Sequence, residues 1–248
     1  MRDLISLGHL NLKEISEEGD AKIRASHIGI IGLGGTGSLA AQLFVRAGVK
    51  SLTIVDFDPV NDTNLQRQIN YTTGDVRQSK AKITENVLSR IRGDVTVISL
   101  GSELTAGNAK EILSGLDLIF DGTDNIRARE IINEYSVQHG IPWIFTSAIG
   151  TTGQFKTVIP GVTSCLRCFV TPDMLNGGSC SDLGILNSVP SIVSALAYTE
   201  GIRVLTGGNI DGALHFIDAW DLRHEKITIR RREDCEVCVQ RKFTHIMK

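Results

Sequence analysis

The sequence predicts an α/β fold: a Rossmann-like, doubly wound, mostly parallel sheet with a C-terminal antiparallel extension. Strand-like and helix-like stretches alternate over residues 27–150, which is the pattern of successive βαβ units. A glycine-rich turn joins the first apolar strand to a helix, as in nucleotide-binding folds of this class. After residue 150 the alternation ends, and residues 151–160 and 213–231 are typical of antiparallel strands.

The elements follow one another along the chain in a simple order. Residues 1–26 are expected to form a short helical lead-in. One apolar strand runs from Ile28 to the glycines, and a second ends at Asp56 after an intervening helix. Further strands are expected over 95–100, 116–120 and 142–147, and helices over 80–91, 106–113 and 192–205. Residues 160–188 lack periodicity and are rich in Gly, Ser, Pro and Asp, so we expect a mobile loop there.

Composition excludes several classes of protein. With 42% hydrophobic and 22% charged residues, the chain is typical of a folded globular domain rather than a disordered one. A net charge of −2 gives no general attraction to nucleic acid or to an anionic membrane. No apolar run approaches the ~20 residues of a membrane span, and charges interrupt the N-terminus too early for a signal peptide. We therefore expect a cytoplasmic protein with no nucleic-acid or membrane partner.

The glycine-rich turn predicts a nucleotide site. Its glycines allow the backbone to approach a phosphate at a helix N-terminus; they are Gly32, Gly34, Gly35 and Gly37. Asp56 ends the second strand, where an acidic side chain can hold ribose hydroxyls. This pattern alone also fits a redox protein that binds a nicotinamide or flavin dinucleotide.

Three further features favour ATP over a redox dinucleotide. Arg67 and Gln68 follow the second strand closely, and Lys80 begins the next helix. The segment 121–125, Asp-Gly-Thr-Asp-Asn, comes directly after the fourth strand, at the edge where α/β sheets bind ligands. Cationic side chains suit the phosphate charge, and a carboxylate suits Mg²⁺. The combination predicts a site for ATP and Mg²⁺.

Together these motifs resemble those of the ubiquitin-activating-enzyme-like adenylyltransferases, the ThiF/MoeB/HesA type. The motifs are G-x-G-G-x-G, D-x-D-x-V-x-x-x-N-L-x-R-Q, the following lysine, and T-D-N with a downstream arginine, and the resemblance extends over residues 20–240. It implies an enzyme that joins AMP to a carboxylate with release of pyrophosphate. It also implies a single adenylation domain over 1–248, with an ATP-binding half (27–150) and an acceptor-side half (151–248) that carries a crossover loop at about 169–190.

The resemblance assigns roles to individual residues. Asp56 would hold the ribose, and Asp124 would bind Mg²⁺. Arg129 and Asn133 would support the helix after the fourth strand and the site. The residues expected to contact the nucleotide are Gly32, Gly34, Gly35, Gly37, Asp56, Asp58, Asn64, Arg67, Gln68, Lys80, Asp124, Asn125 and Arg129. The expected catalytic residues are Arg67, Lys80, Asp124 and Cys180.

Four of the five cysteines form two C-x-x-C pairs, Cys165 with Cys168 and Cys235 with Cys238. Two such pairs can make a tetrahedral Cys₄ zinc site with no open position, which is a structural centre. It would join the C-terminal end of the chain to the segment after residue 160. The alternative, a pair of redox motifs, lacks a thioredoxin-like βαβ context.

Cys180 is the remaining cysteine, and it aligns with a Cys-x-x-x-Gly motif on the family's loop across the active site. The resemblance implies either covalent transfer chemistry or an idle thiol at this position, because relatives differ there.

The acceptor side departs from the family pattern. No Arg-Tyr-x-Arg-Gln segment occurs near the N-terminus, residues 185–191 differ from the usual Gly- and Pro-containing run, and Ala197 replaces a glutamine. Two carboxylate substrates therefore stay open. One is the C-terminal glycine of a ubiquitin-like sulfur carrier. The other is a small molecule, as in the branch that activates guanylylpyridinol for the iron-hydrogenase cofactor. A catalytically silent scaffold subunit and, more remotely, a redox dehydrogenase are alternatives. The resemblance also implies a homodimer.

Overall fold

A single mixed sheet forms the centre of the protein. The computed structural model describes residues 7–170 and 184–246. Within them, eight strands lie in the order β3-β2-β1-β4-β5-β6-β7-β8. Strands β1 to β5 are parallel, and β6, β7 and β8 are added antiparallel to their neighbours. The bounds are β1 His27–Ile31, β2 Ser51–Val55, β3 Thr96–Leu100, β4 Leu118–Asp121, β5 Trp143–Ile149, β6 Thr152–Val158, β7 Leu214–Asp218 and β8 Arg223–Ile227. The predicted fold class is confirmed.

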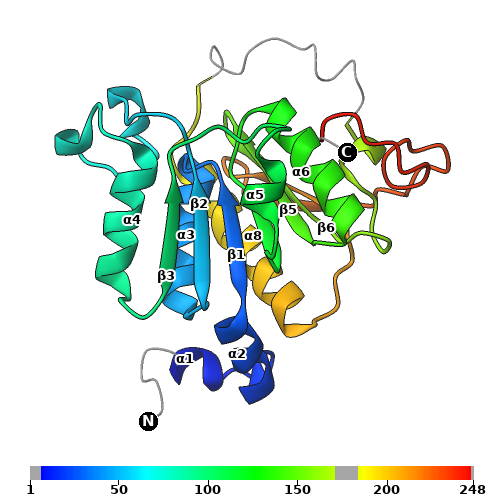
Figure 1. Ribbon diagram of the computed structural model, residues 1–248, viewed down its shortest axis with the longest axis horizontal. Helices are drawn as coiled ribbons and strands as arrows, with labels where there is room; N and C mark the ends of the chain where they lie inside the picture. Colours follow the sequence, from blue (N-terminus) through cyan, green and yellow to red (C-terminus); the bar gives the residue numbers. More distant parts are fainter. Residues whose placement is uncertain (1–6, 171–183, 247–248) are drawn as a thin grey trace.

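Helices cover both faces of this sheet (Figure 1). Helices α3, α4 and α8 pack with one face, and α5 and α6 pack with the other. The bounds are α1 Leu7–Leu10, α2 Ser16–Ala25, α3 Gly35–Ala47, α4 Lys80–Ile91, α5 Ala109–Leu113, α6 Ile126–His139 and α8 Ser188–Thr206. Short 3₁₀ segments are η2 Asp62–Asn64, η3 Thr73–Asp75 and η4 Leu166–Cys168.

The central strands are buried on both sides, which explains why they are apolar without alternation. Ile30 of β1 packs into the core on the α3 side, and its neighbour Ile31 packs into the core on the α6 side. Phe120 and Ile119 of β4 divide between the two cores in the same way. Because both faces of these strands are covered, polar groups can reach a ligand only from the strand ends, the adjoining glycine-rich turn and the helix caps. A binding site must therefore lie at an edge of the sheet.

Two predicted helices begin elsewhere than the sequence indicated. The helix expected over 106–113 begins at Ala109, because the side chain of Asn108 accepts the backbone N–H of Thr105 and holds a turn. The helix expected from 192 begins at Ser188. Pro190 lies in its first turn, where a missing N–H costs little, so the proline marks the start of the helix and not a loop before it.

The described part of the predicted lead-in contains two helices, α1 and α2. Helix α2 packs against α8, and Ile23 of α2 is fully buried in the core. Helices α1 and α2 lie at the opposite end of the molecule from the η2 and η3 segments (Figure 1). None of the described helices is long and apolar enough to cross a membrane. Residues 163–166, expected in a mobile loop, are buried and hydrogen-bonded instead, because they pack under the C-terminal segment.

Candidate nucleotide site and cysteine cluster

The glycine-rich turn lies where the strand order reverses. Strand β1 has β2 on one side and β4 on the other, and the chain crosses to β2 first and to β4 later. At the carboxyl ends, the N–H of Gly32 binds the carbonyl of Val55 and the N–H of Gly122 binds the carbonyl of Ile31. Such switch points are where open α/β sheets bind ligands, so the geometry and the glycine motif agree.

Two of the four glycines are required by the backbone itself. Gly32 has φ +87°, and a Cβ there would approach the backbone of Gly122 to 2.8 Å. A Cβ on Gly37 would meet the carbonyl oxygen of Gly32 at 1.9 Å. In contrast, a Cβ on Gly34 would meet nothing closer than 3.8 Å, and Gly35 lies against Pro190 of α8. The turn is therefore closely packed at Gly32 and Gly37, whereas space remains beside Gly34.

Asp56 fixes the turn from the end of β2. Its carboxylate accepts the N–H of Leu33 at 2.7 Å and the N–H of Asp58 at 2.8 Å. Burial raises the pKa of Asp56 above its ordinary value, and the nearby charge of Lys80 acts in the opposite direction. The predicted ribose ligand therefore also organises the backbone of the phosphate-binding turn, and its oxygens keep further acceptor capacity.

Lys80 lies beside this carboxylate. It is the first residue of α4, its side chain is only 7% exposed, and its ammonium is 3.0 Å from the carboxylate of Asp58. The backbone N–H of Lys80 also binds the carbonyl of Asp58. Both contacts hold a cation at the carboxyl edge, within the electrostatic range of Asp56.

The N-L-x-R-Q segment continues from η2. Asn61 is the N-cap of η2, and Asn64 completes a capping box by accepting the N–H of Asn61 with its side chain. The guanidinium of Arg67 makes one hydrogen bond with the described residues, to the carbonyl of Thr63, so most of its donors are available. Gln68 is buried, its Oε1 atom has no hydrogen-bond partner among the described residues, and its Nε2 atom lies close to Gly34. An unpartnered buried amide beside the open side of the turn is what a ligand-binding side chain looks like without its ligand.

Arg129 holds the loop after β4. Its guanidinium donates to the carboxylate of Asp121 at 3.0 Å and to the carbonyls of Thr123 and Thr146. The same group lies over the ring of Phe145, 4.8 Å from its centroid. Asp121 is fully buried, and burial raises its pKa while Arg129 acts in the opposite direction. Arg129 therefore organises the loop through these contacts.

Two other residues of this loop differ in their surroundings. Asp124 is exposed and makes no hydrogen bond or ion pair with the described residues, so its carboxylate is available at the carboxyl edge. Asn125 is the N-cap of α6, accepting the N–H of Arg127 at 2.9 Å. One carboxylate is thus presented to solvent on a loop that Asp121, Asn125 and Arg129 hold in place.

Cys180 and most of the expected crossover loop lie outside the described residues. The chain returns at Gly184, and residue 185 bridges Gly150 at the end of β5. The side chain of Gln66 donates to the carbonyl of Ile185 at 2.9 Å. The N-L-x-R-Q segment is therefore in direct contact with the end of the predicted loop.

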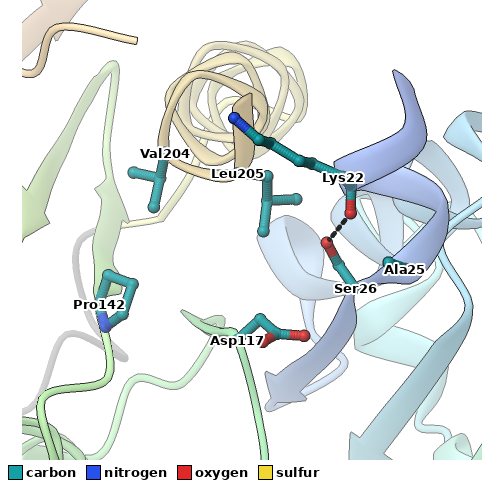
Figure 2. A pocket seen from close by; sticks show the side chains of 7 residues that line it. All are labelled: Lys22, Ala25, Ser26, Asp117, Pro142, Val204 and Leu205. Atoms are coloured by element: carbon teal, nitrogen blue, oxygen red, sulfur yellow. Dashed lines mark hydrogen bonds between the residues drawn. The ribbon is translucent and has the colours of Figure 1, made fainter. Parts of the chain in front are cut away.

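A pocket at the opposite edge of the sheet is unrelated to this site. Residues from α2, from the starts of β4 and β5 and from the end of α8 line it, and Figure 2 shows them: Lys22, Ala25, Ser26, Asp117, Pro142, Val204 and Leu205. The ammonium of Lys22 is paired with Glu18, and Asp117 accepts the N–H of His27. Its charged groups are thus already bonded within the protein, so the pocket offers no nucleotide site.

The four cysteines of the two C-x-x-C pairs come together. The distance between sulfur atoms is 3.6 Å for Cys165 and Cys235, 3.6 Å for Cys168 and Cys238, and 4.0 Å for Cys165 and Cys168. All four sulfurs lie within 4.8 Å of one another, and the four thiols are free. Tetrahedral zinc with bonds of about 2.3 Å requires sulfurs about 3.8 Å apart. The residues fit a zinc ion.

Helix α6 supports this cluster. Asn133, predicted to support the site, accepts the N–H of Leu166 with its side chain at 3.0 Å, so it anchors the first cysteine pair. Glu130 pairs with Arg167 at 2.6 Å. Behind the cluster, Lys156 of β6 is fully buried, and burial lowers its pKa to about 8. The cluster and the nucleotide site are thus joined through a single helix.

Several residues that shape the site were not found from the sequence. In the sequence, Asp121 stands out only as part of the 121–125 motif, although its position at the end of a buried strand indicates that it shapes the site. Tyr71 donates its hydroxyl to the carbonyl of Leu33, and Thr146 donates to the carbonyl of Asp121. Ser194 of α8 donates to the carbonyl of Thr36. These contacts join distant segments, so no local pattern signals them.

Comparison with known proteins decides the family. The ThiF family pattern matches residues 7–237, which is nearly the whole chain. The chain belongs to the ThiF family. It is 34% identical over 235 residues to the sulfur carrier protein ThiS adenylyltransferase of Bacillus subtilis (strain 168), covering 92% of this chain and 69% of that protein. It is 31% identical to the SAMP-activating enzyme E1 of Haloferax volcanii, covering 93% and 86%. The ThiF-family chain is an adenylyltransferase.

Solved structures agree on the fold. The structure of Escherichia coli MccB with MccA-N7isoASN superposes with a TM-score of 0.80 at 18% identity, covering 89% of this chain and 69% of that one. The structure of MccB with ATP superposes with a TM-score of 0.79. At this identity the likeness establishes the ThiF-type fold.

Proposed function

We propose that this ThiF-family protein transfers AMP from ATP to a carboxylate and releases pyrophosphate. The observation that carries the proposal is the set of charged groups around the open side of the glycine turn. Arg67 has available guanidinium donors, Lys80 is held at the first turn of α4, and Asp124 is exposed with no partner in the part of the chain that the structure describes. Cations and a free carboxylate at a switch point suit a nucleoside triphosphate with Mg²⁺.

The chemistry follows from these positions. The incoming carboxylate attacks the α-phosphate, and the bond to pyrophosphate breaks. Lys80 and Arg67 would offset the charge that grows on the phosphate oxygens and on the departing pyrophosphate. Asp124 would bind Mg²⁺, which neutralises phosphate charge when bound. Asp56 would hold the ribose, and Gln68 would donate to the ligand in front of Gly34.

Lys80 must exchange partners in this reaction. In the structure its ammonium is bound to Asp58, whose side chain is 48% exposed. A half-exposed ion pair contributes little to stability, about 0–1 kcal/mol, so phosphate oxygens can replace Asp58 at small cost. Asp58 would then act as the resting partner that keeps Lys80 at the site.

We further propose that Cys165, Cys168, Cys235 and Cys238 bind a structural zinc ion. All four positions of a tetrahedral site are protein ligands, so no position is left for a substrate. The zinc would fix the C-terminal segment beside α6, where Figure 1 shows that segment. Free thiols and a need for ATP both favour a cytoplasmic protein.

For the acceptor, the C-terminal carboxylate of a ubiquitin-like sulfur carrier is the first candidate, because two relatives carry the name sulfur carrier protein ThiS adenylyltransferase. A small-molecule carboxylate is the second. It is favoured by the replaced run over residues 185–191, which adjoins the site through Pro190, and by Ala197. A homodimer also stays a proposal, which sedimentation at equilibrium tests.

ATP–pyrophosphate exchange tests the function and separates the acceptors. The protein is assayed with Gly-Gly-tailed carrier proteins, and then with a panel of small heteroaromatic carboxylates. Exchange with a carrier alone supports the first acceptor and refutes the second, and the reverse result does the opposite. ATP binding without exchange for any acceptor would instead indicate a catalytically silent scaffold.

A further inference from the structure

A lysine is buried on the sheet face that carries the cysteine cluster. Lys156 of β6 is fully buried, and it lies between Phe145 of β5 and Leu214 of β7 in the strand register. Directly opposed residues of neighbouring antiparallel strands project to the same face. Phe145 and Leu214 pack in the same apolar core as Cys165 and Cys235. The stem of Lys156 therefore enters the core that the cysteine cluster covers.

No carboxylate is hydrogen-bonded to this ammonium within residues 7–170 and 184–246. Its hydrogen bond there is to the carbonyl of Gly212. The neighbouring Asp211, which is partly exposed, is instead bound to Lys226 at 2.8 Å. An ammonium that is taken out of water and hydrogen-bonds only to a neutral acceptor is costly, so a nearby anion would stabilise its charge.

Two other cations near the cysteines have acidic partners. Arg167, between the first two cysteines, is paired with Glu130 at 2.6 Å. Arg232, just before the second pair, is bound to Asp234 at 3.0 Å. Among these cationic side chains, Lys156 is the one that is fully buried and hydrogen-bonded only to a backbone carbonyl. It is therefore a buried cation that can balance the charge the cluster acquires.

A bound zinc ion gives the cluster that charge. Four thiols lose their protons to water when they bind Zn²⁺, and four thiolates with one dication carry a net charge of −2. We propose that Lys156 is the buried counter-charge of this zinc–tetrathiolate centre and that it sets how tightly the zinc is held. The proposal rests on the zinc site proposed above, and it gives the structural centre a charge partner outside its four ligands.

Zinc affinity of the full-length protein tests this. Lys156→Met keeps the length of the side chain and removes its charge, and Lys242→Met removes an exposed lysine that follows the second cysteine pair. Partners around metal ligands typically change metal affinity 10–100-fold, so competition with a chromogenic chelator should show zinc binding weakened about 10-fold or more in Lys156→Met. Lys242→Met should match the wild type. Equal affinity in Lys156→Met and wild type overturns the proposal.

A second measurement separates charge from packing. Zinc should raise the melting temperature of the wild type by more than it raises that of Lys156→Met. If Lys156 served packing alone, the substitution would instead lower the melting temperatures of the zinc-bound and the zinc-free protein equally. If Lys156→Met does not fold, Lys156→Arg, which keeps the charge, should retain zinc better than Lys156→Gln. Equal loss in both overturns the proposal. A wild type that binds no zinc refutes the zinc centre itself, together with this inference.

Discussion

Replacing Arg129 tests the view that this residue organises the site through the loop after β4. Arg129→Met removes a cation that binds the fully buried Asp121 and also binds the carbonyls of Thr123 and Thr146. Breaking a buried ion pair from one side costs about 3–5 kcal/mol, because the remaining charge is left uncompensated. A typical domain is stable by about 5–15 kcal/mol, so the variant should fold with a much reduced stability.

The stability that Arg129→Met loses should depend on pH. Burial raises the pKa of Asp121, and Arg129 opposes that rise, so the pKa should be higher still in the variant. A carboxyl whose pKa is raised by folding contributes its stability at low pH and loses it as pH rises through the folded-state pKa. The difference between wild type and Arg129→Met should therefore be smallest in mild acid and grow toward neutral pH.

Urea unfolding at several pH values measures both effects. Arg127→Met is the matched control, because Arg127 lies on the same helix with an exposed side chain, and it should change stability by no more than about 0.5 kcal/mol. In an Asp121→Asn background, Arg129→Met should cost less by at least about 1 kcal/mol, since no charge is left behind. An Arg129→Met protein as stable as Arg127→Met would refute the reasoning.

Three further predictions concern the charged groups and thiols. Lys80→Met and Asp124→Ala should each lower pyrophosphate exchange by about 10²-fold or more, because they remove charge from the transition state, and unchanged rates in either would contradict the assignment. Lys82→Met, on the same helix with an exposed side chain, should leave the rate near that of the wild type. Cys180→Ser should leave exchange intact, since adenylation precedes any thiol chemistry, and its abolition would show that the two steps are not separate. Cys235→Ser should release zinc, measured by metal analysis, and should melt at the temperature of chelator-treated wild type; retention of a full zinc equivalent would refute the Cys₄ assignment.

The glycine-rich turn and the strands beside it are predictable from the sequence because their features depend on local backbone chemistry. Gly32 and Gly37 are required by backbone geometry that leaves no space for a side chain, and Asp56 is the polar end of a buried strand. These constraints act within one βαβ unit, so a short stretch of sequence carries them. The spacing of the two C-x-x-C pairs likewise predicted that the cysteines would gather, which the structure confirms.

The rest depended on contacts between distant segments. That Arg129 reaches Thr146 of β5 depends on the pairing of β4 with β5, which no local pattern encodes. The start of α8 was misplaced because Pro190 is a helix breaker in the interior and a good residue in the first turn. Asn133 serves the cysteine cluster, which only the packing of η4 on α6 reveals.

Transfer of isotope from ATP tests the central claim most directly. The protein is incubated with an acceptor that supports exchange and with ATP labelled either at the α-phosphate or at the γ-phosphate. Attack at the α-phosphate predicts that the α-label appears on the acceptor, with a mass increase of one AMP, and that the γ-label leaves in pyrophosphate. A γ-label on the acceptor, with ADP as the other product, would contradict the account.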